Sequence, residues 1–310
     1  CQHITFENEW IPVDALQELD RNGDKFSPPL SSLLPLVNKL SQRRLLDDLA
    51  IPSPAWIALE EIDVDSPVLP VGWAFPLMAK AAHGGYDGKG TCVIRDLKSL
   101  RDLLSSVSVE DWLLETWVAY ERELALVVSR DRQGRIRSLP LVETHQKNQV
   151  CDWVLAPAES EQLLEATAYN IAASLLTSLG YVGVMALEFF YGPAGLMVNE
   201  IAPRTHNSGH FSIEACSSSQ FDQQLCITAG LPVPATDLVT PGAIMVNLLG
   251  LPCEGTAPLK SRLAAIEAIS RSHLHWYGKK EMPGRKVGHV TVLLEQTDPV
   301  ARSQEASEVL

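Results

Sequence analysis

The sequence predicts an α+β fold, in which amphipathic helices, β-hairpins and a strand-rich C-terminal part follow one another. The clearest helix is expected over 159–179, where apolar residues recur at spacings of three and four and Gly180 suits the C-terminal cap. A hairpin is expected next, with strands over 182–190 and 195–201 around a Gly-Pro-Ala turn. From 242 onward, short strands dominate, and they are expected over 243–249, 274–277 and 287–295.

The other elements are separated by glycine and proline, which mark turns. They are a strand over 4–6, helices over 13–19 and 34–49, a strand over 75–81, a strand over 91–94, a helix over 96–104, a strand over 112–118, a hairpin over 124–128 and 136–142, and a helix over 214–229. The acidic tail from Asp298 onward is expected to be mobile.

The composition excludes several classes of protein. The formal net charge of −13 argues against general nucleic-acid binding, which needs a basic face. No window approaches the ~20 apolar residues of a membrane span. The six cysteines are scattered without a C-x-x-C pair, so we expect reduced thiols in a cytoplasmic protein. Because the chain has neither a signal peptide nor an initiator methionine, we expect it to begin inside a longer protein.

Two strand carboxylates predict a metal site. Glu188 lies in an otherwise apolar strand, and Glu200 lies in the strand expected to pair with it. A register that pairs 188 with 200 would place both carboxylates on one face, although the sequence leaves that register open. A divalent cation would relieve their repulsion, oxygen ligands suit magnesium, and Asn199 could supply a further oxygen. The alternative is two unrelated carboxylates that face solvent.

A glycine-rich loop over 84–90 predicts a phosphate site. Its four glycines allow close backbone approach, and exposed N–H groups in such a loop bind phosphate oxygens. Lys80, a few residues upstream, can place its ammonium over the same phosphates. The spacing matches neither a Walker A loop nor G-x-G-x-x-G, so a plain hairpin turn is the alternative for this loop alone.

Two further groups of charges are candidates for ligand binding. Glu115 and Glu123 flank the end of a strand, where a carboxylate can accept ribose hydroxyls or an adenine amine. Four cations lie within 279–286 of an otherwise acidic chain, and they could neutralise a substrate phosphate. The alternatives are a solvated run of charges for the first group and a basic surface loop for the second.

The stretch 199–210 carries the densest chemistry. A carboxylate, two carboxamides, a guanidinium and two imidazoles fall within its twelve residues, at the end of an apolar strand. Such a cluster is costly to bury, and it suits the binding of a metal, a phosphate or a small anion. The alternative is a polar loop whose side chains cap one another.

In combination, these segments resemble the ATP-grasp superfamily and, within it, the PurK-type 5-(carboxyamino)imidazole ribonucleotide synthase family. The resemblance rests on residues 5–9, 84–90, 115–124, 186–190, 199–215 and 284–289. It spans almost the whole chain, and the ordered combination is far more specific than any single motif.

The resemblance implies an ATP-grasp fold with two α+β lobes, a Rossmann-like N-terminal domain and a small C-terminal β-rich domain. We therefore expect 1–37 to be a remnant of the first domain and 38–235 to be the ATP-grasp domain, with its small lobe at about 75–118. We expect 236–297 to be the C-terminal domain and 298–310 a tail. The usual early glycine-rich strand and loop are missing, so we expect this chain to lack most of the first domain.

The resemblance also implies ATP- and bicarbonate-dependent carboxylation of 5-aminoimidazole ribonucleotide through carboxyphosphate, in purine (IMP) biosynthesis. Mg²⁺ is then expected on Glu188 and Glu200 with Asn199 beside them, and ATP is the co-substrate. The residues expected to bind ATP are Lys39, Lys80, Gly85, Gly88, Lys89, Gly90, Glu115, Trp117, Val118 and Glu123. Lys39 stands where the family often has an arginine, so charge is kept but bidentate pairing is not.

The same resemblance assigns the carboxylation chemistry. Bicarbonate and carboxyphosphate are expected at Arg204, His206 and Asn207, and Asp87 is expected to steer or deprotonate the substrate amine. The residues expected near aminoimidazole ribonucleotide are Glu7, Tyr86, Lys279, Arg285 and Lys286. The expected partners are these small molecules and a second copy of the chain, in a cytoplasmic homodimer.

Two alternatives stay open from the sequence. Another ATP-grasp ligase or transformylase acting on a purine precursor would share the metal pair and the loop but differ in its acceptor. A nucleotide-binding remnant without turnover would follow if the incomplete N-terminal part removed activity. A purely structural protein is disfavoured, because three polar constellations would then each need a separate explanation.

Overall fold

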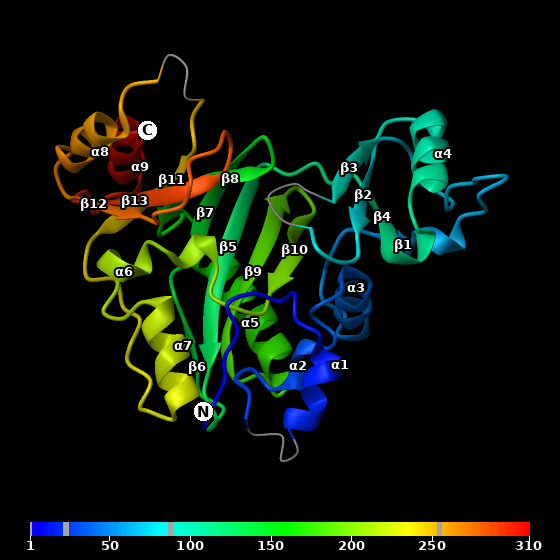
Figure 1. Cartoon of the computed structure of the whole chain (residues 1–310), viewed down its shortest axis with the longest axis horizontal. Helices are drawn as coiled ribbons and strands as arrows, with labels where there is room; N and C mark the ends of the chain where they lie inside the picture. Colours follow the sequence, from blue (N-terminus) through cyan, green and yellow to red (C-terminus); the bar gives the residue numbers. More distant parts are fainter. Residues whose placement is uncertain (1, 21–24, 86–89, 253–255) are drawn as a thin grey trace.

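The computed structural model describes residues 2–20, 25–85, 90–252 and 256–310, whose strands form two antiparallel sheets (Figure 1). The smaller sheet has the order β1-β4-β2-β3 and consists of β1 (Trp56–Ala58), β2 (Leu77–Ala81), β3 (Thr91–Ile94) and β4 (Trp112–Thr116). Helix α4 (Leu97–Ser106) packs on one face, against Leu77, Ala79 and Leu114. Because strand side chains alternate, Lys80 and Glu115 point from the opposite face.

The larger sheet contains nine strands among the described residues, in the order β10-β9-β5-β7-β8-β11-β13-β12, with β6 paired to β5. These strands are β5 (Arg122–Arg130), β6 (Ile136–Ser138), β7 (Val142–Lys147), β8 (Val150–Ala156), β9 (Gly183–Gly192), β10 (Gly195–Ala202), β11 (Gly242–Leu249), β12 (Ser272–Trp276) and β13 (Lys286–Leu294). The C-terminal strands continue the same sheet, because β11 pairs with β8.

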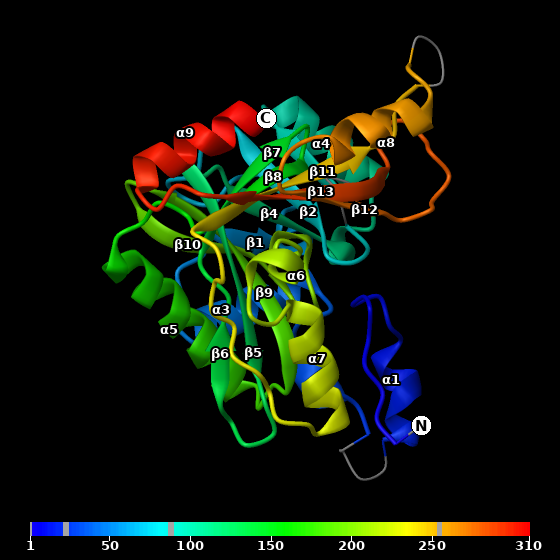
Figure 2. The same ribbon diagram turned by 90° about the vertical axis from the view of Figure 1, so that its left-hand side faces the viewer.

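Helices cover both faces of the larger sheet (Figure 2). One core contains α5 (Gln162–Ser178) with α1 (Val13–Leu16) and α2 (Leu30–Leu33), and the opposite face carries α6 (Ser212–Ala215) and α7 (Gln220–Ala229). The C-terminal strands are covered by α8 (Leu259–Glu267) and α9 (Pro299–Val309). Short 3₁₀ turns are η1 (Gln17–Leu19), η2 (Leu59–Glu61), η3 (Val109–Asp111) and η4 (Asn207–Gly209). No described helix combines the length and apolar character that a membrane crossing requires.

One helix, α3 (Lys39–Asp48), connects the two sheets. Its Leu40 packs with Ala58 and Leu113 of the smaller sheet, whereas its Leu46 belongs to the core under the larger sheet. Burial of apolar side chains on both sides stabilises this position, at roughly 1.5–3 kcal/mol for each fully buried leucine. The polar side chains of α3 are thereby held between the sheets, where the site is built.

Two predicted helices are wrong in their bounds. The helix expected over 34–49 begins only at Lys39, because the Asn38 side chain accepts hydrogen bonds from backbone N–H groups of the first turn. The helix expected over 214–229 is divided, and α7 begins after Ser219, whose side chain forms a capping box. Side-chain caps therefore override the apolar spacing at both places.

Strand and tail expectations also need correction. The strand over 4–6 is reduced to one bridge, from Ile4 to Phe26. The strand over 112–118 ends at Thr116, and the second hairpin strand, expected over 136–142, ends at Ser138. Val142 starts the separate strand β7, whose hairpin with β8 the sequence analysis did not predict. The tail expected to be mobile is helix α9, which is capped by Asp298 and packs against β11 and β13.

Candidate active site

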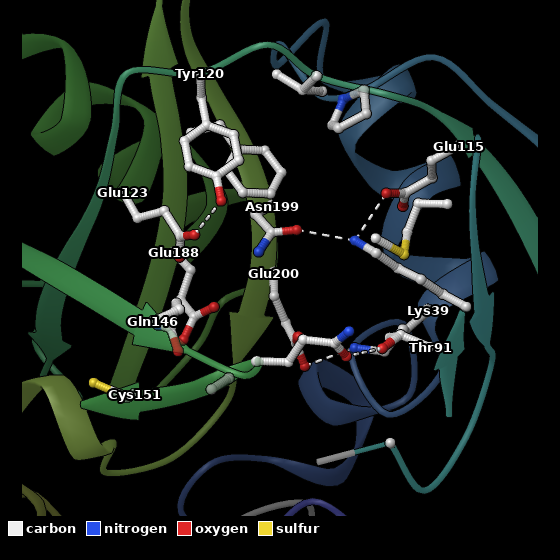
Figure 3. A pocket seen from close by; sticks show the side chains of 18 of the residues that line it. Lys39, Thr91, Glu115, Tyr120, Glu123, Gln146, Cys151, Glu188, Asn199 and Glu200 are labelled. Atoms are coloured by element: carbon white, nitrogen blue, oxygen red, sulfur yellow. Dashed lines mark hydrogen bonds and ion pairs between the residues drawn. The ribbon is translucent and has the colours of Figure 1, made fainter. Parts of the chain in front are cut away.

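A cavity of about 470 Å³ lies between the two sheets, and both contribute to its walls (Figure 3). The smaller sheet supplies Lys80 and Glu115, and the larger sheet supplies Glu123, Glu188 and Glu200. The other lining residues are Glu9, Lys39, Pro54, Met78, Gly85, Thr91, Thr116, Trp117, Val118, Tyr120, Gln146, Gln149, Cys151, Phe190, Asn199, Ala202, Arg204, His206, Asn207 and Lys286. Charged groups that are far apart in the sequence therefore meet in one place.

On the side of the smaller sheet, the cavity wall is a cluster of charged side chains that pair with one another. Glu115 is 2% exposed and lies 2.6 Å from Arg43 Nη2 and 2.8 Å from Lys80 Nζ. Arg43 also donates to the backbone carbonyls of Val198, at 3.2 Å, and Asn199, at 2.7 Å, which ties α3 to β10. Lys80 donates in addition to Asn199 Oδ1 at 2.9 Å. Each charge in this cluster has an opposite charge or a hydrogen-bond partner.

Burial and pairing act in opposite directions on the pKa values of this cluster. Burial lowers the pKa of Lys80, and the neighbouring Glu115 offsets only part of this effect. Burial would raise the pKa of Glu115, but Lys80 and Arg43 outweigh it, so the pKa is lowered. Glu115 therefore stays ionised and holds the Lys80 ammonium in place at the cavity wall.

The wall on the side of the larger sheet carries two carboxylates. In the hairpin of β9 and β10, Glu188 lies opposite Glu200, which is the register that the metal prediction required. Asn199 sits in an irregularity between the two paired segments of β10. Glu200 lies 2.7 Å from Lys39 Nζ, and Glu188 lies 3.4 Å from His206 Nε2. The two carboxylates thus share one face of the sheet.

The pKa values of these two carboxylates shift in opposite directions. Burial, together with the charges of Glu200 and Glu123, raises the pKa of Glu188. Burial acts in the same sense on Glu200, but Lys39 outweighs it and lowers that pKa. A partly buried carboxylate pair with one ammonium is short of positive charge, which fits a divalent cation. The described residues contain no group of three or more His, Cys, Asp or Glu side chains that could hold a metal.

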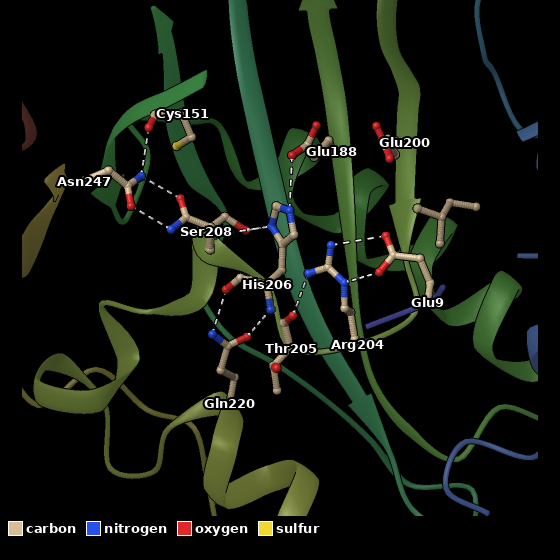
Figure 4. Close-up of polar contacts among 12 residues, drawn as sticks. Glu9, Cys151, Glu188, Glu200, Arg204, Thr205, His206, Ser208, Gln220 and Asn247 are labelled. Carbon is tan, nitrogen blue, oxygen red and sulfur yellow. Dashed lines mark hydrogen bonds and ion pairs between the residues drawn. The ribbon is translucent and has the colours of Figure 1, made fainter. Parts of the chain in front are cut away.

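Side chains of the stretch 199–210 reach separate partners (Figure 4). Arg204 forms a two-point ion pair with Glu9, from Nε to Oε2 and from Nη2 to Oε1 at 3.2 Å. Gln220 brackets the backbone of His206, accepting from its N–H at 2.8 Å and donating to its carbonyl at 2.7 Å. Asn207 pairs with Asn247 of β11. These contacts to distant segments distinguish the stretch from a polar loop that only caps itself.

His206 faces Glu188 as a neutral donor. The backbone N–H of Ser208 donates to His206 Nδ1 at 3.3 Å, so Nδ1 is the acceptor and Nε2 carries the proton that points toward Glu188. Burial, with the nearby charges of Arg204 and Lys286, lowers the pKa of His206 to about 3. At neutral pH the imidazole therefore adds a hydrogen bond to the carboxylate wall without adding positive charge.

A third part of the wall combines aromatic rings with a carboxylate. The ring of Tyr120 stacks on Phe190 with centroids 4.6 Å apart, and Tyr120 Oη donates to Glu123 Oε1 at 2.6 Å. Burial raises the pKa of Glu123, although hydrogen bonds from Tyr120 and Gln146 oppose this effect. Trp117 lines the same cavity. Flat apolar surface beside a hydrogen-bond acceptor suits a base and its ribose.

Most predicted site residues lie on the cavity wall. They are Lys39, Lys80, Gly85, Glu115, Trp117, Val118, Glu123, Glu188, Asn199, Glu200, Arg204, His206, Asn207 and Lys286. Gly90, with a φ of +77°, lies close to the backbone of Gly85. Glu7, Lys279 and Arg285 are exposed and do not line this cavity. Tyr86, Asp87, Gly88 and Lys89 lie outside the described residues.

Five residues that position the site were not predicted from the sequence: Glu9, Arg43, Tyr120, Gln146 and Asn247. Glu9 belongs to the segment 5–9 that supports the resemblance, and Arg43 follows Lys39 by one helical turn on the same face. Both signals were present in the sequence. Gln146 and Asn247 carry no local signal, because their partners come from segments far away along the chain.

Comparison with known proteins gives consistent matches. A model of the ATP-grasp domain matches residues 44–221, and a model of the phosphoribosylaminoimidazole carboxylase C-terminal domain matches 243–303. The N5-carboxyaminoimidazole ribonucleotide synthase of Synechococcus elongatus is 44% identical over 313 residues, covering 100% of this chain and 78% of that protein.

Solved structures support the same likeness. Carboxyaminoimidazole ribonucleotide synthase from Aspergillus clavatus, complexed with ATP, has a TM-score of 0.86 and 30% identity, covering 100% of this chain and 81% of that one. The enzyme from the same organism with ADP and 5-aminoimidazole ribonucleotide has a TM-score of 0.84 and 27% identity, with the same coverage of both chains. The predicted ATP-grasp fold is thereby confirmed.

Proposed function

The chain belongs to the N5-carboxyaminoimidazole ribonucleotide synthase family of ATP-grasp enzymes, and we propose how its residues carry out the family's reaction. It is a ligase that uses ATP and bicarbonate to convert 5-aminoimidazole ribonucleotide to 5-(carboxyamino)imidazole ribonucleotide in purine biosynthesis. The assignment of residues rests on one observation. Glu188, Glu200 and the buried ammonium of Lys80 all line the same cavity. This arrangement suits nucleotide phosphates and their cation.

We infer a reaction in two steps. A bicarbonate oxygen attacks the γ-phosphorus of ATP, the bond to ADP breaks, and carboxyphosphate forms. The exocyclic amine of the ribonucleotide then attacks the carboxyl carbon, inorganic phosphate leaves, and the amine loses a proton. The protein must offset charge during phosphoryl transfer and exclude water from carboxyphosphate, so positioned cations and a closed cavity are the relevant features.

Glu188 and Glu200 would hold the Mg²⁺ that accompanies ATP. When bound, this ion offsets charge on the phosphates. Lys39, which pairs with Glu200, and Lys80, which pairs with Glu115, are the ammonium groups assigned to the phosphates. Because Asn199 Oδ1 already accepts a hydrogen bond from Lys80, we assign Asn199 to orienting that lysine beside the metal pair.

The adenine and ribose are assigned to the aromatic part of the wall. Trp117, Val118 and Tyr120 supply the surface, and Glu123 supplies the acceptor for ribose hydroxyls. Both oxygens of Glu115 are engaged by Arg43 and Lys80, so we give Glu115 the role of positioning Lys80 and leave the ribose contact to Glu123. The glycine-rich loop over 84–90 stays the predicted cover for the phosphates.

Bicarbonate and carboxyphosphate are assigned to Arg204, His206 and Asn207, which line the cavity at the end of β10. Arg204 brings positive charge, and its two-point pairing with Glu9 sets the plane of the guanidinium. His206 and Asn207 bring neutral polar groups. Contacts of the ribonucleotide with Glu7, Tyr86, Lys279, Arg285 and Lys286 stay predictions. The same holds for the proton role of Asp87, the cytoplasmic location and the homodimer.

The reaction is tested by measuring ADP release while each substrate is omitted or replaced. We expect release to need both 5-aminoimidazole ribonucleotide and bicarbonate, and to be absent with glycinamide ribonucleotide or formate instead. Calorimetry should show that Glu188→Gln and Glu200→Gln each remove magnesium-dependent ATP binding, whereas Glu60→Gln at an exposed position keeps it. Turnover with the replacement substrates would contradict the reaction, and full magnesium–ATP binding by both variants would contradict the metal assignment.

A further inference from the structure

We propose that Asn247, in the C-terminal strand β11, is a positioning residue that sets the amide orientation of Asn207 in the carboxylation site. The proposal rests on the proposed function of Asn207 as a contact for bicarbonate and carboxyphosphate. Asn247 itself is 5% exposed and does not line the cavity between the two sheets. Its effect on the reaction would therefore be exerted through Asn207.

The two asparagines form a reciprocal amide pair. Asn207 Nδ2 donates to Asn247 Oδ1 at 2.8 Å, and Asn247 Nδ2 donates to Asn207 Oδ1 at 2.7 Å. The second N–H of Asn247 donates to the backbone carbonyl of Cys151 at 2.9 Å (Figure 4). Both donors of Asn247 are thus used, and the pair is held from the β8 side of the sheet.

The backbone carbonyl of Cys151 determines which way the side-chain amides of Asn247 and Asn207 are oriented. A side-chain amide has nearly the same shape when it is flipped, so its orientation depends on its partners. A backbone carbonyl can only accept, which requires Nδ2 of Asn247 to face Cys151. Oδ1 of Asn247 must then face Asn207, and it selects the Nδ2 end of that amide. One N–H of Asn207 remains for an oxyanion, in a direction that Asn207 alone could not maintain.

This contact joins the two matched parts of the chain at the site. Asn207 lies within 44–221, the ATP-grasp match, and Asn247 lies within 243–303, the C-terminal match. The strand that carries Asn247 pairs with β8 on one side and β13 on the other, where Asn247 lies opposite His289. The C-terminal strands therefore do more than extend the sheet, because one of them completes the geometry of the carboxylation site.

The test is Asn247→Asp, which keeps size and acceptor but removes both N–H donors. We expect the KM for bicarbonate to rise about tenfold, the effect of losing one oriented hydrogen bond, while the KM for ATP stays within about twofold. Asn170→Asp, at an exposed position of α5, is the matched control and should leave both values unchanged. A structural role alone would lower thermal stability and affect both substrates together.

A double-mutant cycle separates direct from indirect action. If Asn247 acts through Asn207, then Asn207→Ala and the double variant should have the same bicarbonate KM, because the second change has nothing left to orient. Additive effects, or an unchanged bicarbonate KM in Asn247→Asp, would overturn the proposal. If Asn247→Asp fails to fold, Asn247→Ser carries the same comparison. Absence of any bicarbonate dependence in the unmodified protein would instead overturn the proposed function itself.

Discussion

The carboxylates on the two charged walls of the cavity have opposite charge environments. On the smaller sheet, Glu115 is 2% exposed and lies against two cations, Arg43 and Lys80. On the larger sheet, Glu188 and Glu200 are 27% and 37% exposed and lie opposite each other. Lys39 lies 2.7 Å from Glu200, whereas His206, the neighbour of Glu188, is neutral at ordinary pH. The first wall surrounds one carboxylate with two cations, whereas the second places two carboxylates beside one ammonium.

This difference suggests two roles: Glu115 positions Lys80, whereas Glu188 and Glu200 bind a cation. A buried carboxylate that is already paired with two cations gains little from a further ligand, but it holds Lys80 in one orientation toward the cavity. An unbalanced pair of carboxylates opposes folding, and a structure retains it where a cation later supplies the missing charge. The walls thus predict opposite consequences for the same Glu→Gln substitution, which provides a sharp way to test the comparison.

Glu115→Gln should have the largest effect. It removes the anion from between two buried cations, and breaking a buried pair in this way costs about 3–5 kcal/mol of unfolding free energy. Urea denaturation measures the loss, and Glu60→Gln at an exposed position of η2 is the control. A loss below about 1 kcal/mol would show that Glu115 is not needed to hold the two cations in the folded state.

Glu188→Gln should have the opposite sign. Without magnesium, removing one of two facing carboxylates should raise the free energy of unfolding by about 1–2 kcal/mol, less than a fully desolvated pair would give because the side chain is 27% exposed. The same variant should lose magnesium-dependent ATP binding. Stability that falls instead would mean that the contact between Glu188 and His206 outweighs the repulsion from Glu200.

The pH dependence sharpens this second prediction. The pKa of Glu188 is raised above its ordinary value of 4.5, so its protonated form stabilises the folded state at low pH. That stabilisation is lost as pH rises through the raised pKa, and the advantage of Glu188→Gln should grow over the same interval and then level off. His206 acts in the opposite sense, since its pKa is lowered to about 3 and stability is lost as pH falls below 6.5.

The carboxylates Glu188 and Glu200 of the larger sheet were more predictable from the sequence than the partners of Glu115 on the smaller sheet. Glu188 and Glu200 lie in two strands joined by a short turn, so a local hairpin was sufficient to bring them together. The partner of Glu115 was not foreseeable in this way, because Arg43 is 72 positions away and reaches it only after α3 packs between the sheets. The contact of Glu9 with Arg204 spans 195 positions.

Local patterns also misplaced several boundaries for an identifiable reason. Apolar spacing predicted a helix from 34, but the cap at Asn38 delays it to Lys39 and so aims that lysine at Glu200. The β7–β8 hairpin was missed because its strands carry many polar side chains, and two of these, Gln146 and Cys151, line the cavity. The segments that depart from simple apolar patterning, the start of α3 and the β7–β8 hairpin, therefore lie beside the site.

The smallest predicted effect concerns the aromatic wall, where a single hydrogen bond is removed. Tyr120→Phe keeps the ring on Phe190 but deletes the donor to Glu123. Burial favours the protonated form of Glu123, and the Tyr120 hydroxyl opposes this, so its loss should weaken the ribose acceptor. We expect the Kd for ATP to rise about threefold to fivefold, in keeping with one net hydrogen bond, with little change in unfolding free energy. Calorimetry with ATP is the measurement. Tighter binding would show that Tyr120 competes with the ribose for Glu123. This wall would then resemble Glu115, whose oxygens are already paired, more than the carboxylates Glu188 and Glu200.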